Sequence, residues 1–306
     1  MTVPAPILAA TDFSALSRHA ADRAARLAQE TGAPLSLMHV TLDSALQELR
    51  QWLGAGHVME QQLLAEAREQ LARLADQLAA RHGVGVRTVE AAGAVPEAIE
   101  DEVRRLGAGL LVLGARGAGF LRRLVLGTTS ERLVRRSSCP VLVVRQTAHE
   151  PYRRVLVALD RSPWAAAMLQ VVRGVAPHAR PVLLAAYQVP FQEKLRFAGV
   201  NAATVEHYRQ QARMRASQHV HALAARHRLA PGDYDAVIVE GEASQRIVEQ
   251  EQEHDCDLVV LGKHSRSAAE DLLLGSVTQH VLAEGAADVL VATATATATA
   301  TPTLAP

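Results

Sequence analysis

The sequence lacks most of the residues that mark secreted, zinc-bound or membrane-spanning proteins. Only two of its 306 residues are cysteine, and Cys139 and Cys256 do not form a CxxC pair. This argues against a disulfide framework or a zinc ribbon and fits the reducing cytosol, so we expect a cytoplasmic protein. The N-terminus has no basic segment followed by an apolar core, and no apolar run is long enough to span a membrane.

The chain also has no formal net charge and few aromatic side chains. Lys+Arg and Asp+Glu number 32 each, so the chain has no overall basic field to attract nucleic acid. Aromatic residues make up 3% of the chain, whereas 49% is hydrophobic, with much Ala, Leu and Val. This composition favours helices packed on a sheet, and the length predicts two domains, each with its own core.

Common catalytic motifs are also missing. The sequence contains no HExxH, GxSxG or GxxxxGK[ST] pattern, so no lysine is placed to reach the β- and γ-phosphates of a nucleotide. Cys139 lacks a nearby His or CxxC partner, and we interpret it as a buried structural thiol. His219 and His221 are interpreted as part of a solvated helix face, because residues two apart point in different directions. We therefore predict no catalytic residues, no metal site and no rapid hydrolysis.

What the chain does contain is an internal repeat with a spacing of 148 residues. Four pairs of landmarks keep this spacing, namely Asp12 and Asp160, Gly93 and Gly241, Gly114 and Gly262, and Gly127 and Gly275. A constant register between landmarks indicates duplication of one domain. We predict a first domain at 1–148, a second at 151–292, and a low-complexity Ala/Thr tail at 293–306 that is disordered.

Each half alternates strand-like and helix-like segments. In the first half we expect strands at Ile7–Thr11, Pro34–Val40, Val86–Ala91, Leu110–Leu113 and Val141–Arg145, and helices from an N-cap at Ser14 to Glu30 and at Val58–Arg81, Val95–Arg105 and Gly127–Arg136. The second half repeats this order. Such alternation predicts an α/β fold with a doubly wound, mainly parallel, five-stranded sheet in each half and helices on both faces.

The most informative stretch joins the fourth expected strand to the last expected helix of the first half. The apolar run Leu110–Leu113 is followed by Gly114. Two residues separate Gly114 from Gly117, and nine separate Gly117 from Gly127-Thr128. Glycines at these places suit a sharp turn or the close approach of a ligand. A helix that starts at the last glycine presents unpaired N–H groups and a positive dipole end, which favours a phosphate. The alternative is that the glycines are ordinary turn residues.

This glycine-two-glycine-nine-glycine-Ser/Thr pattern resembles the nucleotide motif of the universal stress protein family. The resemblance covers both halves and implies a Rossmann-like strand order 3-2-1-4-5, with the halves packed as a pseudo-twofold dimer. It implies that the aspartate after the first strand contacts the adenosine part of the ligand and that Val40 packs on adenine. An ordinary charge at a helix start is the alternative for Asp12. The nucleotide-binding residues expected in the first half are Asp12, Val40, Leu113, Gly114, Arg116, Gly117, Gly127, Thr128 and Thr129.

The resemblance further implies a stress-response sensor or regulator that binds ATP, or ADP or AMP, with Mg²⁺ as an optional companion. One alternative is a slow ATPase or autophosphorylating enzyme that uses Thr128 or Thr129. Another is a protein-interaction scaffold that binds no nucleotide. We expect the two halves to pair within the chain, with a further homodimer as an open option, and we expect neither nucleic acid nor membrane as a partner.

The second half carries a degenerate copy of the motif at Asp160, Gly262, Ser265, Gly275 and Ser276. Ser265 replaces Gly117, and Glu270-Asp271 replaces Arg122-Arg123. At the same spacing Gln188 replaces Val40. These changes predict that the first half binds nucleotide and the second binds it weakly or not at all. The alternative for the two acidic residues is a structural pairing with the two arginines.

Overall fold

The computed structural model describes residues 4–42, 57–115, 126–162, 165–189, 201–263 and 274–293. The first half contains β1 (Ile7–Ala10), α1 (Ala15–Thr31), β2 (Leu35–Leu42), α3 (His57–His82), β3 (Val86–Gly93), α4 (Val95–Leu106), β4 (Leu110–Gly114), α5 (Thr128–Arg136) and β5 (Val141–Val144). The second half contains β6 (Arg154–Ala158), α6 (Ala165–Val175), β7 (Arg180–Tyr187), α8 (Ala202–Arg226), β8 (Asp235–Glu240), α9 (Ala243–Glu253), β9 (Leu258–Gly262), α10 (Ser276–Glu284) and β10 (Asp288–Ala292).

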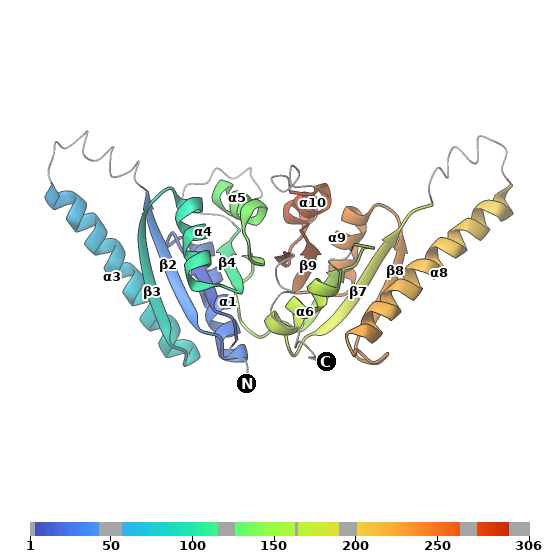
Figure 1. The fold of residues 1–306 in the computed structure, drawn as a ribbon, viewed down its shortest axis with the longest axis horizontal. Helices are drawn as coiled ribbons and strands as arrows, with labels where there is room; N and C mark the ends of the chain where they lie inside the picture. Colours follow the sequence, from blue (N-terminus) through green and yellow to red (C-terminus); the bar gives the residue numbers. More distant parts are fainter. Residues whose placement is uncertain are drawn as a thin grey trace, which may run out of the picture.

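The ten strands of the described residues belong to one sheet, in the order β3-β2-β1-β4-β5-β10-β9-β6-β7-β8. Figure 1 shows the first half on one side of the molecule, from β3 inward, and the second half on the other side, out to β8. Each half therefore has the order 3-2-1-4-5 with parallel neighbours, which confirms the predicted fold class. The halves join edge to edge through an antiparallel pair, β5 and β10. Leu142 lies opposite Leu290, its own counterpart at the 148-residue spacing, so a pseudo-twofold axis passes between these two residues.

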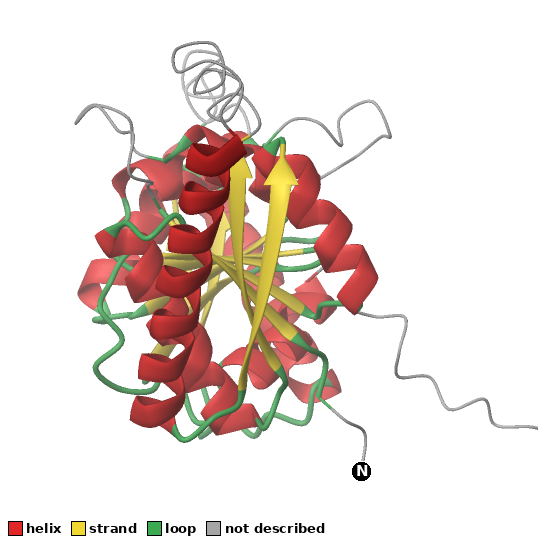
Figure 2. Cartoon of the chain, turned by 90° about the vertical axis from the view of Figure 1, so that its left-hand side faces the viewer, coloured by secondary structure: helices red, strands yellow, loops and turns green. Residues whose placement is uncertain are grey.

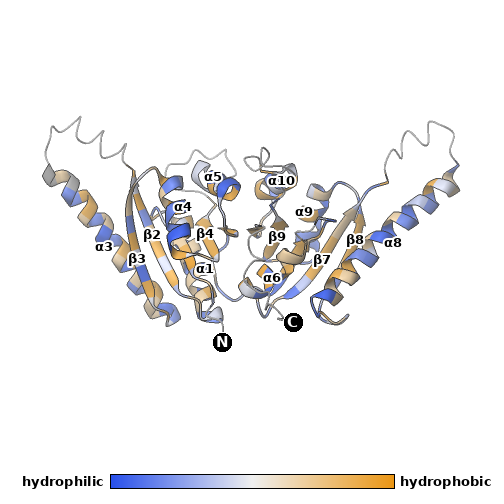
Figure 3. Cartoon of the chain, in the orientation of Figure 1, coloured by the Kyte–Doolittle hydropathy of each residue, from blue (hydrophilic) through white to orange (hydrophobic). Residues whose placement is uncertain are grey.

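The central strands are buried on both sides, as expected for a doubly wound sheet, whereas the outer strands β3 and β8 are intermediate or exposed. Every residue of β4, β5 and β10 is buried, and these strands are near-continuous apolar runs. Figure 3 shows the hydrophobic colour of β4. Figure 2, viewed from the side of α3 and β3, shows helices against both faces of the twisted sheet. Each of the two core clusters includes residues from both halves, for example Leu142 and Leu290 in one and Val143 and Val289 in the other.

Local signals set the helix ends as the sequence predicts. Ser14 caps α1 by accepting a hydrogen bond from the Ser17 N–H, and Gly32 ends that helix with a left-handed φ of 69°. Pro96 lies in the first turn of α4, where its missing N–H costs no helical hydrogen bond. Gly93 and Gly241, the landmarks that follow the third strand of each half, share φ values of 137° and 141°.

The 148-residue register does not hold throughout, which overturns the alignment of Val40 with Gln188. The Thr11 N–H donates to Met38 O, whereas the corresponding Leu159 N–H donates to Leu184 O, at a spacing of 146. The connection between the first two strands is thus two residues shorter in the second half, and the register is regained by the third strand. The residue equivalent to Val40 is therefore Ala186, since these two pair with Ala91 and Val239, which are 148 apart.

A buried polar cluster fixes the junction between the halves. Asp288 is fully buried, and its carboxylate accepts the Arg145 and Gln146 N–H groups at 2.7 and 3.0 Å and the Tyr152 hydroxyl at 2.6 Å. Arg23 from α1 lies over the Tyr152 ring at 4.0 Å, with its Nε 3.5 Å from Asp288 Oδ2. Burial and the Asp288 carboxylate raise the pKa of Tyr152 well above its usual value, so the hydroxyl remains a donor.

Candidate functional site

The first-half residues singled out in the sequence gather at the carboxyl edge of three adjacent strands. Asp12 follows β1, the buried Val40 lies in β2, and Gly114 ends β4, with β1 between the other two strands. This edge is the topological switch point of the half, where connections leave in opposite directions and ligands of such sheets bind. The predicted residues Arg116 and Gly117 lie outside the described residues, as do Arg122 and Arg123.

Gly114 is required by the packing of the protein itself. A Cβ at this position would come within 2.9 Å of the Leu16 carbonyl and the Ser17 backbone nitrogen of α1. The Ser130 hydroxyl of α5 also donates to Gly114 O at 2.9 Å, and this contact is buried. The glycine therefore allows α1 to approach the end of β4, a reason that the sequence alone does not reveal.

The start of α5 is anchored to β4 by its own backbone. Gly127 is the N-cap of α5 with an ordinary φ of −66°, and its N–H donates to Ala115 O at 2.9 Å. The first-turn N–H groups of a helix have no intrahelical acceptor, and here they belong to Thr128, Thr129 and Ser130. Because the Ser130 hydroxyl binds Gly114 O, the side-chain donors left at this helix start are those of the exposed Thr128 and the half-buried Thr129.

The loop after β1 is held in a strained turn that brings an aromatic ring to the site. Phe13 has a φ of +63°, unusual for a bulky residue, and its N–H donates to Thr11 Oγ1 at 3.0 Å. Its ring stacks on His39 of β2 at 4.4 Å, and His39 Nδ1 lies 2.8 Å from Thr11 O. Sequence reasoning missed this pair, although Phe13 is one of only four phenylalanines and directly follows Asp12.

Asp12 has a role at the helix start. Its Oδ1 accepts the Ser14 N–H at 3.1 Å, and the side chain is exposed. The carboxylate therefore supports the turn into α1, as the alternative interpretation of this residue expects. A carboxylate has two oxygens with several acceptor positions, so this contact leaves capacity for a ligand donor.

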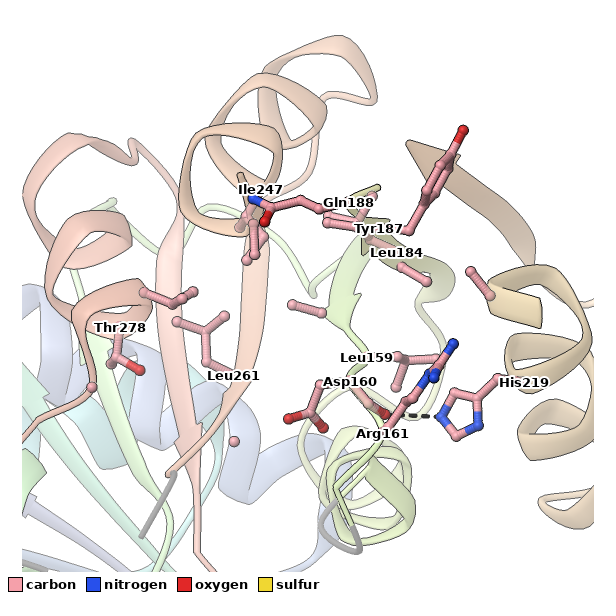
Figure 4. Close-up of a pocket in the computed structure, with 18 of the residues that line it drawn as sticks. Leu159, Asp160, Arg161, Leu184, Tyr187, Gln188, His219, Ile247, Leu261 and Thr278 are labelled. Atoms are coloured by element: carbon pink, nitrogen blue, oxygen red, sulfur yellow. Dashed lines mark hydrogen bonds between the residues drawn. The ribbon is translucent and has the colours of Figure 1, made fainter. Parts of the chain in front are cut away.

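In the second half the equivalent edge encloses a cavity of about 490 Å³ (Figure 4). Four of the five residues predicted for the degenerate site line it, namely Asp160, Gly262, Gly275 and Ser276. Ser265 lies outside the described residues. An added Cβ at Gly275 would meet no atom within 4 Å, so the space in front of α10 is open.

The cavity has an apolar wall and a few converging polar groups. The wall comes from β7, α8, α9 and β9 and includes Leu184, Ala185, Ala212, Ala216, Ile247 and Leu261. The Asp160 carboxylate lies inside, with Oδ1 accepting the Ser162 N–H at 3.0 Å (Figure 4). His219 of α8 places Nε2 2.8 Å from Asp160 O and so steadies this loop. Gln188 and Arg161 add polar groups to the lining.

Both cysteines of the chain are buried thiols. Burial raises the pKa of the Cys139 thiol to about 11 and that of Cys256 to about 12, so both are protonated at neutral pH. Among the described residues no group of three or more His, Cys, Asp or Glu side chains could hold a metal ion. None of the helices in the described ranges is both long and apolar enough to cross a membrane.

Comparisons with known proteins agree on one family. The family model described as "Universal stress protein family" matches the chain twice, at residues 5–145 and 151–293. Universal stress protein Rv2005c of Mycobacterium tuberculosis is 30% identical over 190 residues, which cover 60% of this chain and 61% of the relative. Universal stress protein YxiE of Bacillus subtilis is 32% identical over 145 residues, 45% of this chain and 97% of the relative. The match to the mycobacterial relative thus spans less than two thirds of its length.

Solved structures share the fold over nearly the whole chain. A universal stress protein from Archaeoglobus fulgidus superposes with a TM-score of 0.66 at 17% identity, covering 94% of this chain and 98% of the other. A structure from Pseudomonas aeruginosa gives a TM-score of 0.58 at 19% identity, covering 95% and 93%. These identities support the shared fold and nothing finer.

Proposed function

The chain belongs to the universal stress protein family, and from this premise we propose that its first half binds an adenine nucleotide, ATP first of all, as a sensor or regulator of a stress response. The support comes from the complete motif Gly114, Gly117, Gly127 and Thr128 and from the place of its described residues at the switch point. Nucleotide binding, rather than the identity of the stress, is the content of the proposal.

One observation carries the proposal, namely the anchoring of the α5 start at the end of β4. The Gly127 N–H binds Ala115 O, and Ser130 binds Gly114 O, so the helix start is fixed where the switch point opens. In the proposed complex the Thr128 and Thr129 N–H and hydroxyl groups receive the phosphates. The segment between Gly114 and Gly127 contains three arginines and no acidic residue, which adds positive charge for the same phosphates.

The nucleoside end of the ligand is proposed to lie toward β1 and β2. Asp12 would accept a hydrogen bond from a ligand hydroxyl or amino group, and the buried Val40 would offer an apolar surface to the base. We propose binding rather than fast turnover, because the motif has no lysine for the γ-phosphate and no paired carboxylates.

The test is a titration of the full chain with ATP by calorimetry, together with mass spectrometry of any nucleotide that copurifies. We expect one tight site per chain. The variant Thr128→Val keeps the size and branching of the side chain but removes its hydroxyl, and we expect it to weaken ATP binding. Ser276→Val, at the equivalent position of the second half, is the matched control and should leave the tight site intact. Absence of ATP binding in the unmodified chain would support the scaffold alternative instead.

A further inference from the structure

We propose that the cleft between α4 and α5 binds a small zwitterion, a free α-amino acid, with its ammonium group on Glu100 and its carboxylate on Arg132 and Arg136. The two helices pack against each other in the first half (Figure 1). The cleft between them has a volume of about 280 Å³. None of its lining residues belongs to the proposed nucleotide site, so this inference goes beyond the proposed function.

Charged side chains from both helices line this cleft. On α4 they recur at a spacing of three to four residues and so share one face of the helix, and on α5 two arginines stand four positions apart. The charged lining residues are Glu97, Glu100, Asp101 and Arg104 of α4 and Arg132 and Arg136 of α5. Ligand pockets are usually lined by apolar side chains and have volumes of about 300–1,000 Å³. A smaller cleft with a charged lining is suited to a small, charged molecule.

Glu100 carries a buried carboxylate oxygen that accepts no hydrogen bond from the described residues. The residue is 8% exposed, and its Oε1 is shielded from solvent. Arg104 Nη1 lies 3.9 Å from Glu100 Oε2, which is beyond hydrogen-bond distance, and Arg104 donates to Asp101 Oδ1 instead. A buried carboxylate without donors destabilises the fold, and a ligand ammonium group that donates to it removes this penalty.

The charges of the cleft are unevenly paired. Glu97 Oε1 lies 3.4 Å from Arg136 Nη1 and 3.5 Å from Arg132 Nη2, so one carboxylate is shared by two guanidinium groups. Further along α4 the other two carboxylates share one guanidinium group, that of Arg104. The cleft therefore has excess positive charge beside the arginines of α5 and excess negative charge beside Glu100. A zwitterion complements both, whereas a simple anion or cation is repelled by one of them.

The second half lacks this arrangement, although α9 and α10 pack as α4 and α5 do. At the 148-residue spacing Val248 replaces Glu100, and His280 and Glu284 replace the two arginines of α5. Val248 is partly buried and packs against the hydrophobic core. This position of the fold thus accepts an apolar side chain, so the packing of the two helices does not require a carboxylate there. This supports a binding role for Glu100.

The test uses the full chain and each of the standard L-amino acids, first by thermal melting and then by calorimetry. A ligand that binds the folded chain alone raises its Tm. We expect at least one amino acid to raise the Tm and to bind with a stoichiometry of one per chain. Its N-acetyl derivative lacks the ammonium group and its amide lacks the carboxylate, and we expect each to bind at least tenfold more weakly.

Two variants of Glu100 separate binding from packing. Glu100→Gln keeps the size of the side chain but removes its charge, and we expect it to weaken amino-acid binding at least tenfold. Glu249→Gln, on the equivalent helix of the second half, is the matched control and should leave the affinity unchanged. Glu100→Val installs the residue of the second half. Without ligand its Tm should be equal or higher, and the rise in Tm on adding the amino acid should disappear.

These measurements are made without ATP, so their outcome does not depend on the proposed nucleotide site. The proposal is overturned if no amino acid binds at millimolar concentration, if the acetylated or amidated form binds equally well, or if Glu100→Gln leaves the affinity unchanged. A lower Tm of ligand-free Glu100→Val would assign the carboxylate a structural role and would overturn the proposal as well.

Discussion

The two halves have the same strand order, but different side chains lie beside the loop that follows the first strand of each half. In both, a histidine ring nitrogen lies 2.8 Å from a carbonyl of the loop after the first strand, yet His39 comes from β2 and His219 from α8. In the first half Phe13 stacks on His39, whereas in the second half His219 is part of the lining of a cavity. The comparison teaches that both copies of the duplicated fold hold this loop by a histidine ring, while the side chains around it differ.

We expect the largest effect on stability at the junction between the halves, where equivalent positions carry different residues. Asp288 stands where the first half has Pro140. Its removal would leave the Tyr152 hydroxyl and two backbone N–H groups without their acceptor and Arg23 without its ion-pair partner. We expect Asp288→Ala to lower the free energy of unfolding by about 3–5 kcal/mol in urea titrations. Asp235→Ala, which removes a half-exposed ion pair with Arg180, is the control and should cost about 1 kcal/mol or less. Equal losses in the two variants would show that the buried cluster stabilises the fold no more than the half-exposed ion pair does.

Leu71 is fully buried, whereas Ala216 lines the cavity, so exchanging leucine and alanine at these two positions should affect the free energy of unfolding differently. Leu71→Ala removes a fully buried side chain, and we expect a loss of about 2–5 kcal/mol in the free energy of unfolding. Ala216→Leu fills existing space in the second-half cavity and should leave stability equal or increased. Chemical denaturation of both variants measures the difference. Similar losses in the two would mean that the cavity wall cannot accept the larger side chain.

Substitution of the glycines at the two helix starts should produce an effect of intermediate size, measured as a change in ATP affinity. Gly127 and Gly275 have φ values of −66° and −58°, which any residue adopts, so valine there should not unfold the chain. We expect Gly127→Val to weaken ATP binding at least tenfold, about 1.4 kcal/mol, because its side chain occupies the proposed phosphate position. Gly275→Val should leave the tight site unchanged. Calorimetry that finds Gly127→Val harmless would remove the first-half assignment.

The smallest expected effect concerns two histidines at equivalent helix ends. Burial and the positive charge of Arg173 lower the pKa of His227, whereas His82 lies 2.9 Å from the Asp22 carboxylate. Because the folded pKa of His227 lies below its unfolded value, its contribution to stability is full above about pH 6.5 and is lost as the pH falls through the folded pKa. We expect His227→Gln to make stability less dependent on pH between 7 and 5. An unchanged pH profile of urea midpoints would contradict this.

Much of the fold followed from the sequence because its signals are local or repeated. The Ser14 cap, the Gly32 stop and the alternation of apolar strands with amphipathic helices each depend on a few neighbouring residues. The strand order came from the family resemblance and is confirmed by the sheet. The edge-to-edge joining of the halves adds a detail that neither source specified, since the pairing of β5 with β10 depends on residues 148 positions apart.

The site was harder to predict because its details are not local. The connection between the first and second strands is two residues shorter in the second half, and sequence reasoning missed this difference. Length changes further along the chain compensate for it, so every landmark glycine keeps the 148-residue spacing. The left-handed turn at Phe13 and the packing reason for Gly114 depend on contacts with other elements. The cavity is lined by small side chains from several elements, among them Ala185, Ala186 and Ala216, and no single one of them differs in the sequence from an ordinary core residue.

Because β5 and β10 pair within one chain, each of the two paired domains has its own coding sequence. In a dimer of separate identical subunits, every substitution appears twice, so neither site can change without the other. Here the partner domain is encoded in the same chain and held at a fixed 1:1 ratio by a connection of nine residues, 145–153, whatever the protein concentration. Each half can then acquire substitutions independently, as Asp288 against Pro140 illustrates. Tandem fusion thus lets the two copies differ in sequence while they stay paired.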